Sequence, residues 1–143
     1  MITVVLRGRN VKVHSGFQKA AAELYHCFVL WRADQPDKVM LTGHSMGAAV
    51  AAMMAMLSEE DDPERIEKLC CVAMPRLGNK TLRRVFDEQF TRDRYRMYGR
   101  KLDPICHLPW FGYARAGHIT WLPSKFDMRL DHAAKKYVAL IKD

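Results

Sequence analysis

The feature that most constrains this chain is a glycine-flanked serine between two segments of opposite pattern. Ser45 is the central residue of Gly43-His44-Ser45-Met46-Gly47. A short strand-like run at residues 38–42 precedes it, and an alanine-rich apolar run at residues 48–57 follows it. A strand, a tight turn and a helix in this order predict a nucleophile elbow, in which the turn lifts the serine hydroxyl above the edge of a sheet.

The two glycines and the following helix explain why this spacing suits a reactive serine. Small residues two positions before and two positions after Ser45 leave room where side chains would collide with the neighbouring strand and helix. The amide of Met46 would then lie at the positive end of a helix, where it can stabilise an oxyanion. A plain Gly-Ser turn that caps a helix is the alternative, and the flanking strand and helix favour the elbow.

The rest of the chain alternates strand-like and helix-like segments. Strands are expected at residues 2–6, 38–42, 69–74 and 94–98, with a strand or hairpin at 114–122. Helices are expected at residues 15–31 with Ser15 as N-cap, at 48–57, after the N-cap Asn79, and from about residue 131. This order predicts an α/β fold with a minimal, mostly parallel sheet and helices on both faces. We expect a single domain over residues 1–143.

A nucleophilic serine requires a base that accepts its proton. In α/β folds with this elbow, an acid and then a histidine follow the serine along the chain. His107 and His118 flank an aromatic-rich loop and a late strand, and His132 begins the last expected helix. The late position favours His132 as the base.

The base in turn requires a carboxylate that orients it. Asp103 follows the strand expected at 94–98, where a side chain would project from the carboxyl edge of the sheet. Asp131 is adjacent to His132, and because neighbouring side chains at a helix start diverge, it is expected to be an N-cap instead. The pattern therefore predicts a triad of Ser45, His132 and Asp103.

Six stretches in order resemble the class 3 lipases, a family of α/β-hydrolases. They are Arg7-Gly8 after a strand, Val13 to Phe17, Leu41 to Ala49, Met74 to Asn79, Asp103 to Pro109, and Asp131 to Tyr137. The resemblance implies an α/β-hydrolase-like fold and the same triad. It also implies an oxyanion hole made by the backbone amides of Met46 and Arg9, and structural roles for His14 and His44.

The sequence departs from the family pattern at and after the second oxyanion position. Arg9 stands where the family usually has serine or threonine, so only its backbone amide can contribute to the oxyanion hole. Only residues 10–13 separate it from His14-Ser15-Gly16-Phe17, which implies a shortened form without the family's usual lid. The exposed acyl site would then be covered by a partner subunit, and a homo-oligomer is one such arrangement.

Aromatic residues follow the expected acid on the same loop. Trp110, Phe111 and Tyr113 are candidates for the rim of the substrate site, because Asp103 anchors their loop. Ordinary packing of these rings is the alternative.

Basic residues concentrate between Arg76 and Lys101. This segment holds nine basic and three acidic residues, in a chain of net charge +7. It either contacts an anionic membrane surface or forms a solvated helix face. No nucleic-acid-binding motif accompanies it, so no nucleic acid partner is expected.

These features predict a serine hydrolase that cleaves a carboxylic ester of a lipid or another acyl compound. The alternative is an inactive module of the same fold that binds anionic lipid or another partner through its basic segment. No metal or organic cofactor is implied by such a mechanism, and the four cysteines match no zinc spacing. The longest apolar run, residues 46–57, is too short for a bilayer, and the N-terminus lacks a signal-peptide pattern, so we expect a cytoplasmic location.

Overall fold

The computed structural model describes residues 1–34, 37–124 and 131–141. In chain order its elements are β1 (Ile2–Leu6), β2 (Arg9–Val13), α1 (Ser15–Arg32), β3 (Val39–His44), α2 (Met46–Asp61), β4 (Ile66–Val72), α3 (Lys80–Gln89), β5 (Tyr95–Arg100), the 3₁₀ helix η1 (Pro104–His107), β6 (Thr120–Leu122) and α5 (Ala134–Val138). The expected strands are present with ends shifted by a few residues, and β6 occupies the end of the segment expected at 114–122.

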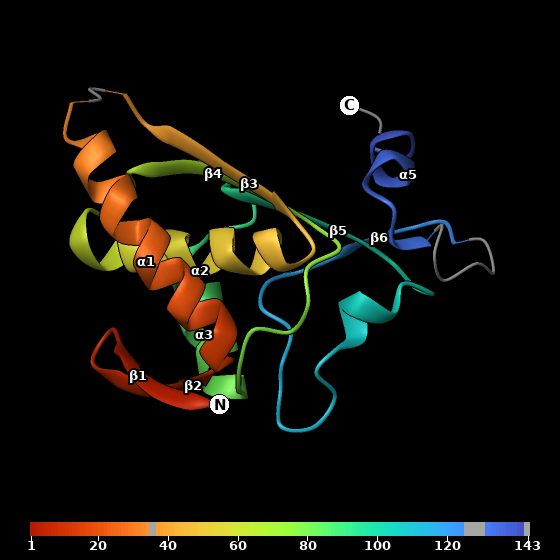
Figure 1. Cartoon of the computed structure of the whole chain (residues 1–143), viewed down its shortest axis with the longest axis horizontal. Helices are drawn as coiled ribbons and strands as arrows, with labels where there is room; N and C mark the ends of the chain where they lie inside the picture. Colours follow the sequence, from red (N-terminus) through yellow and green to blue (C-terminus); the bar gives the residue numbers. More distant parts are fainter. Residues whose placement is uncertain (35–36, 125–130, 142–143) are drawn as a thin grey trace.

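Four strands form a parallel sheet in the order β3-β4-β5-β6. Helix α2 packs on β3 and β4, and α1 packs on α2, whereas α5 lies on the other side of the sheet (Figure 1). Leu69, Cys71 and Met97 belong to the main core. Val72 and Tyr98 alternate with them and pack around the buried ring of Tyr137 from α5. This alternation confirms the expected α/β fold with helices on both faces of the sheet.

The first strand does not join this sheet. Strand β1 pairs with β2 in an antiparallel hairpin, with Leu6 opposite Arg9. Arg7 and Gly8 between them both have positive φ, 47° and 67°, as a two-residue type I′ turn requires. The expected parallel arrangement is therefore wrong for residues 2–6, because this turn returns the chain directly beside β1 whereas a parallel connection needs a longer crossover. Strand β2 packs against α3 instead.

The helices differ from the sequence expectation mainly at their ends. Asn79 caps α3 as expected, since its Oδ1 accepts a hydrogen bond from the amide of Leu82 at 3.0 Å. Ser15 is the first residue of α1 rather than its cap, and the N-cap position is taken by His14 without a side-chain hydrogen bond. Within the described residues, no helix combines the length and the apolar character needed to cross a membrane.

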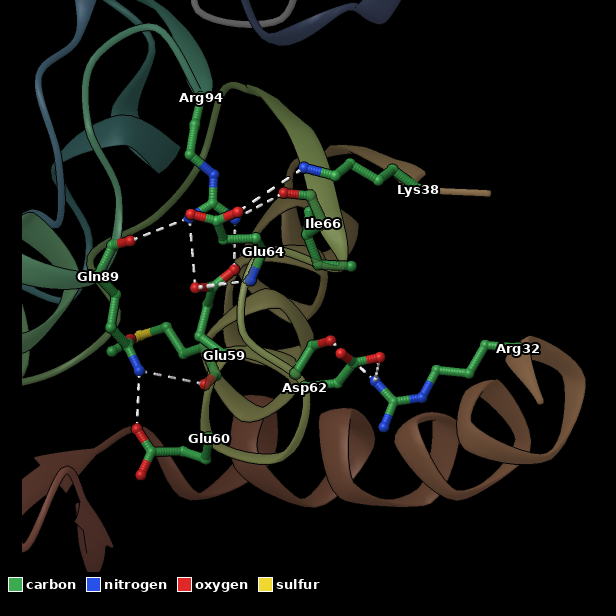
Figure 2. Close-up of polar contacts among 11 residues, drawn as sticks. Arg32, Lys38, Glu59, Glu60, Asp62, Glu64, Ile66, Gln89 and Arg94 are labelled. Carbon is green, nitrogen blue, oxygen red and sulfur yellow. Dashed lines mark hydrogen bonds and ion pairs between the residues drawn. The ribbon is translucent and has the colours of Figure 1, made fainter. Parts of the chain in front are cut away.

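A buried polar network holds the carboxyl end of α2 against the starts of β4 and β5 (Figure 2). Both carboxylate oxygens of Glu59 accept hydrogen bonds from the guanidinium of Arg94, and the Glu59 side chain is only 3% exposed. Arg94 also donates to the carbonyl of Ile66 at 2.7 Å and to that of Gln89 at 3.3 Å. Because the amino end of α2 follows Ser45, this network fixes the helix on which the serine depends.

We expect Arg94→Met to lower the free energy of unfolding by about 3 kcal/mol, because the variant leaves the carboxylate of Glu59 buried without its partner. Lys38→Met is the matched control: Lys38 and Glu64 form an exposed pair at 3.8 Å at the same end of the sheet, and exposed pairs contribute less than about 1 kcal/mol. Urea unfolding followed by circular dichroism measures both variants. Equal losses would show that the Glu59–Arg94 pair has no special structural role.

Candidate active site

Ser45 occupies a sharp turn between β3 and α2. Its backbone has φ 56° and ψ −127°, a strained conformation for a residue with a side chain, and its amide donates to the carbonyl of Val72 at 2.9 Å. A Cβ added to Gly43 would lie 2.4 Å from the carbonyl oxygen of Gly47, whereas a Cβ on Gly47 would meet nothing within 4 Å. The expectation that both glycines make room is therefore right for Gly43 and wrong for Gly47.

The turn presents Ser45 to a histidine that is distant in the sequence. Ser45 Oγ lies 2.9 Å from Nε2 of His132, and Nδ1 of His132 lies 2.9 Å from Oδ2 of Asp103. Asp103 is fully buried, and the His132 side chain is 28% exposed. Because a carboxylate only accepts, Nδ1 carries the proton and Nε2 is left to accept the serine hydroxyl. The structure thus brings together the three residues that the sequence singled out.

Asp103 is positioned by donors from its own loop and from α5. Its Oδ1 accepts from the amide of Ile105 at 2.9 Å, and its Oδ2 accepts from the hydroxyl of Tyr137 at 2.8 Å as well as from the imidazole. Burial raises the pKa of Tyr137 far above its ordinary value, and Cys106 and the hydrogen bond to Asp103 raise it further. Tyr137 therefore remains a protonated donor, and its oxygen accepts in turn from the amide of Arg100 at 3.0 Å.

Two side chains fix the backbone around His132. The preceding residue, Asp131, is fully buried in an ion pair with Arg100, which ties this segment to β5. From β3, Nε2 of His44 donates to the carbonyl of His132 at 3.0 Å, and the two rings lie 4.8 Å apart. The expected N-cap role of Asp131 is wrong, since the N-cap of α5 is Ala133. Asp131 serves instead as an anchor to the sheet.

The two other candidate histidines take part in other contacts. Nε2 of His107 donates to the carbonyl of Lys101 at 2.9 Å, and its Nδ1 lies 3.4 Å from Arg115. His118 is exposed, and its amide donates to the hydroxyl of Tyr95 at 2.9 Å. The structure therefore selects His132 among the three. In the described part of the chain, no group of three His, Cys, Asp or Glu side chains could hold a metal ion.

Met46 is the first residue of α2, so no carbonyl within the helix accepts its amide proton. This donor comes directly after Ser45 and lies at the positive end of the helix dipole. An oxyanion that forms on a carbonyl attacked by Ser45 would be stabilised there.

Arg9, the second residue expected in the oxyanion hole, is not brought to Ser45. It follows the hairpin turn whose Arg7 amide donates to the carboxylate of Glu60 at 2.9 Å, and its own guanidinium pairs with Glu88 at 2.8 Å. Glu60 lies near the carboxyl end of α2, about 20 Å along the helix from the serine. The physical reason for this difference is the β1–β2 hairpin, which separates residues 7–9 from the parallel sheet.

The aromatic residues predicted for the substrate rim lie on the loop after η1, which runs away from α5 (Figure 1). Trp110 and Phe111 are 65% and 92% exposed. Tyr113 lines a cavity with basic side chains. Among the contacts of the described residues, none joins these three rings to Ser45.

Local sequence patterns indicate no supporting role for Tyr137 or Arg100. Tyr137 closes the stretch that begins at Asp131, and only that family spacing pointed to it. Arg100 belongs by sequence to the basic segment between Arg76 and Lys101, and no local pattern indicates that its partner is the distant Asp131.

The model of the family Lipase (class 3) matches residues 3–112, which is most of the chain. The chain belongs to the class 3 lipase family. Lipases from Rhizopus niveus and Rhizopus oryzae are each 27% identical to it over 126 residues. These alignments cover 81% of the chain but only 32% of each relative, so the chain spans about a third of the length of the curated lipases that it matches.

Solved lipase structures share its fold. Lipase II from Rhizopus niveus superposes with a TM-score of 0.68 at 26% identity, over 84% of this chain and 49% of that one. The Rhizomucor miehei triacylglyceride lipase gives 0.69 at 26% identity, over 85% and 49%. For the mono- and diacylglycerol lipase from Aspergillus oryzae, which is 22% identical, the TM-score is 0.73 over 87% and 47%. The chain therefore has the fold of the class 3 lipases over the part of those structures that it covers, as its sequence predicted.

Proposed function

We propose that this chain is a serine hydrolase that cleaves carboxylic esters, in particular lipid or other acyl esters. The observation that carries the proposal is the hydrogen-bonded series Ser45–His132–Asp103, with both heavy-atom distances at 2.9 Å. Membership of the lipase family supports ester hydrolysis at the level of the family. The activity of this shorter chain and the roles of its residues are what we propose.

In this mechanism Ser45 Oγ attacks the ester carbonyl while Nε2 of His132 takes the hydroxyl proton. The negative charge moves to the carbonyl oxygen, where the amide of Met46 stabilises it. The intermediate collapses, and the alcohol leaves with the proton from His132. Water then attacks the acyl-enzyme with His132 again as base, and the acid is released as Ser45 recovers its proton. Asp103 balances the charge of the imidazolium in both halves of the reaction.

One observation favours a second candidate, an inactive module of the same fold. An oxyanion hole commonly contains more than one donor, and loss of one donor typically costs about 10²- to 10³-fold in kcat. Arg9 lies at the other end of α2, so Met46 is the only one of the two expected amides beside Ser45. An active chain is therefore expected to turn over more slowly than an enzyme with two donors.

Labelling with a fluorophosphonate probe separates the two candidates. The folded wild-type chain is expected to be labelled at one site, identified as Ser45 by peptide mapping, and Ser45→Ala is expected to remain unlabelled. Hydrolysis of p-nitrophenyl butyrate and p-nitrophenyl palmitate by the same samples then separates a short-ester esterase from a lipase. A folded wild-type chain that is neither labelled nor active on either ester would favour the inactive module.

A further inference from the structure

A basic cavity lies apart from the triad, between the amino end of α3 and the loop after η1. It has a volume of about 420 Å³ and is lined by Tyr113, Ala114 and five cationic side chains: Arg76, Lys80, Arg83, Arg84 and Arg115. The lining includes no acidic side chain. Five positive groups around one hollow are suited to an anion that carries more than one negative oxygen.

Two of the guanidinium groups are held in place by backbone carbonyls. Arg76 donates to the carbonyl of Trp110 at 3.1 Å, and Arg115 donates to that of Cys106 at 3.0 Å. The guanidinium of Arg115 also lies over the ring of Trp121, 4.9 Å from its centroid. These cations are therefore positioned before any ligand arrives, which lowers the entropic cost of binding.

The positive charge of the cavity is largely uncompensated. Among the described residues, Arg83 is the only one of the five cations with a carboxylate partner, Asp87 at 3.4 Å on the same helix. Burial lowers the pKa of the Arg115 guanidinium, and the charges of Arg76 and Arg83 lower it further. Mutual repulsion of this kind is relieved when an anion binds between the cations. Helix α3 begins at Lys80, so its positive end adds to the same field.

The cavity does not coincide with the basic segment that the sequence indicates. Arg94 and Arg100 of that segment are engaged in pairs with Glu59 and Asp131 inside the protein. Arg115, in contrast, comes from outside the segment and joins the cavity through the fold. The basic residues therefore fall into two groups: Arg94 and Arg100, which form ion pairs inside the protein, and the five cations that line the cavity.

Exposed apolar side chains stand next to this group. The carbonyl of Trp110 accepts the hydrogen bond from Arg76, and the Trp110 side chain is 65% exposed. The next residue, Phe111, is 92% exposed. Leu108 on the same loop is also exposed. Cations beside exposed tryptophan and phenylalanine are the combination that binds a lipid interface, since the rings enter the headgroup region and the cations meet phosphates.

We propose that this cavity binds the phosphate of an anionic phospholipid and that Trp110 and Phe111 insert into the same membrane surface. The site would bring the chain to a lipid surface whether or not Ser45 reacts, so it does not depend on the proposed hydrolysis. It also lies close to the catalytic loop, because Arg115 holds η1, which begins directly after Asp103.

The test measures vesicle binding in the Ser45→Ala background, so that turnover cannot alter the lipid. Vesicles of phosphatidylcholine alone are compared with vesicles that also contain phosphatidylglycerol. We expect binding only to the anionic vesicles, weakened by salt. Lys80→Gln with Arg84→Gln is expected to weaken it about 30-fold, as the loss of two cations near a charged surface implies. Arg92→Gln with Lys101→Gln is the matched control, since it removes the same charge outside the cavity and should retain most of the binding.

Two further measurements identify the source of the phosphate. Tryptophan emission should shift to shorter wavelength on anionic vesicles, and Trp110→Phe should abolish this shift. Inorganic phosphate should not displace the protein from vesicles except at concentrations that act through ionic strength. Equal loss in the two double variants, binding to neutral vesicles as tight as to anionic ones, or efficient displacement by inorganic phosphate would each overturn the proposal.

Discussion

Replacing Asp103 by asparagine is expected to lower kcat for ester hydrolysis about 10⁴-fold while the chain still folds. Asparagine has nearly the same size but can present an amide NH₂ where the carboxylate accepts from Nδ1 of His132. The imidazole then loses the acceptor that keeps its proton on Nδ1. With the proton on Nε2, His132 cannot accept the hydroxyl of Ser45. The measurement is kcat for a p-nitrophenyl ester, with urea unfolding of the same samples.

Tyr137→Phe is the matched variant for this prediction. It removes one donor to the same oxygen of Asp103 but leaves the carboxylate and the tautomer of the base unchanged. We expect kcat to fall about tenfold, the effect of losing one hydrogen bond to a charged acceptor. A wild-type kcat in Asp103→Asn would exclude Asp103 as the triad acid. Equal losses in the two variants would mean that the network acts by positioning rather than through the tautomer of His132.

The proposed triad could be predicted from sequence because each of its three residues follows a local signal. Ser45 stands in a five-residue turn motif between a strand-like and a helix-like run. Asp103 and His132 then follow from the order of acid and base along the chain and from their places after a strand and before a helix. The distances of 2.9 Å confirm that these three local signals meet at one edge of the sheet.

The position of Arg9 could not be derived in the same way, because family order along a chain does not state which strands pair. The information for the hairpin was nevertheless present in residues 7–13. Arg7-Gly8 suits a two-residue turn, and after it Val11 and Val13 are buried while Asn10 and Lys12 are exposed. This alternation of period two indicates a strand, and its tight turn fixes β2 beside β1.

The ion pairs between basic residues and acidic residues distant in the sequence could not be predicted either. Arg94 and Arg100 look like the other basic residues between Arg76 and Lys101, yet both are engaged in the interior. Which charges are buried depends on where β5 lies in the sheet, and that is settled by long-range packing rather than by local pattern.

The second prediction concerns the two glycines that flank Ser45, Gly43 and Gly47, and their effect on stability and kcat. Gly43→Ala places a Cβ 2.4 to 2.6 Å from backbone atoms of Gly47 and Ala48. These are backbone atoms, which cannot rotate away from the new Cβ as a flexible side chain could. Either β3 or the start of α2 must therefore move. We expect a loss of about 3 kcal/mol in the free energy of unfolding. We also expect a decrease in kcat of at least about 10²-fold, because a shift of about 1 Å at the nucleophile has that cost.

Gly47→Ala tests the same motif from its other end. Gly47 is the second residue of α2, and an added Cβ meets nothing within 4 Å. Alanine is the better helix former by about 1 kcal/mol, so this variant should keep wild-type kcat and unfold at equal or higher urea concentration. The two substitutions add the same methyl group four residues apart, and the close contacts at Gly43 are the reason why only Gly43→Ala is expected to lower kcat. A loss of kcat in Gly47→Ala without loss of stability would show that the active form places another segment, or a second copy of the chain, against this glycine.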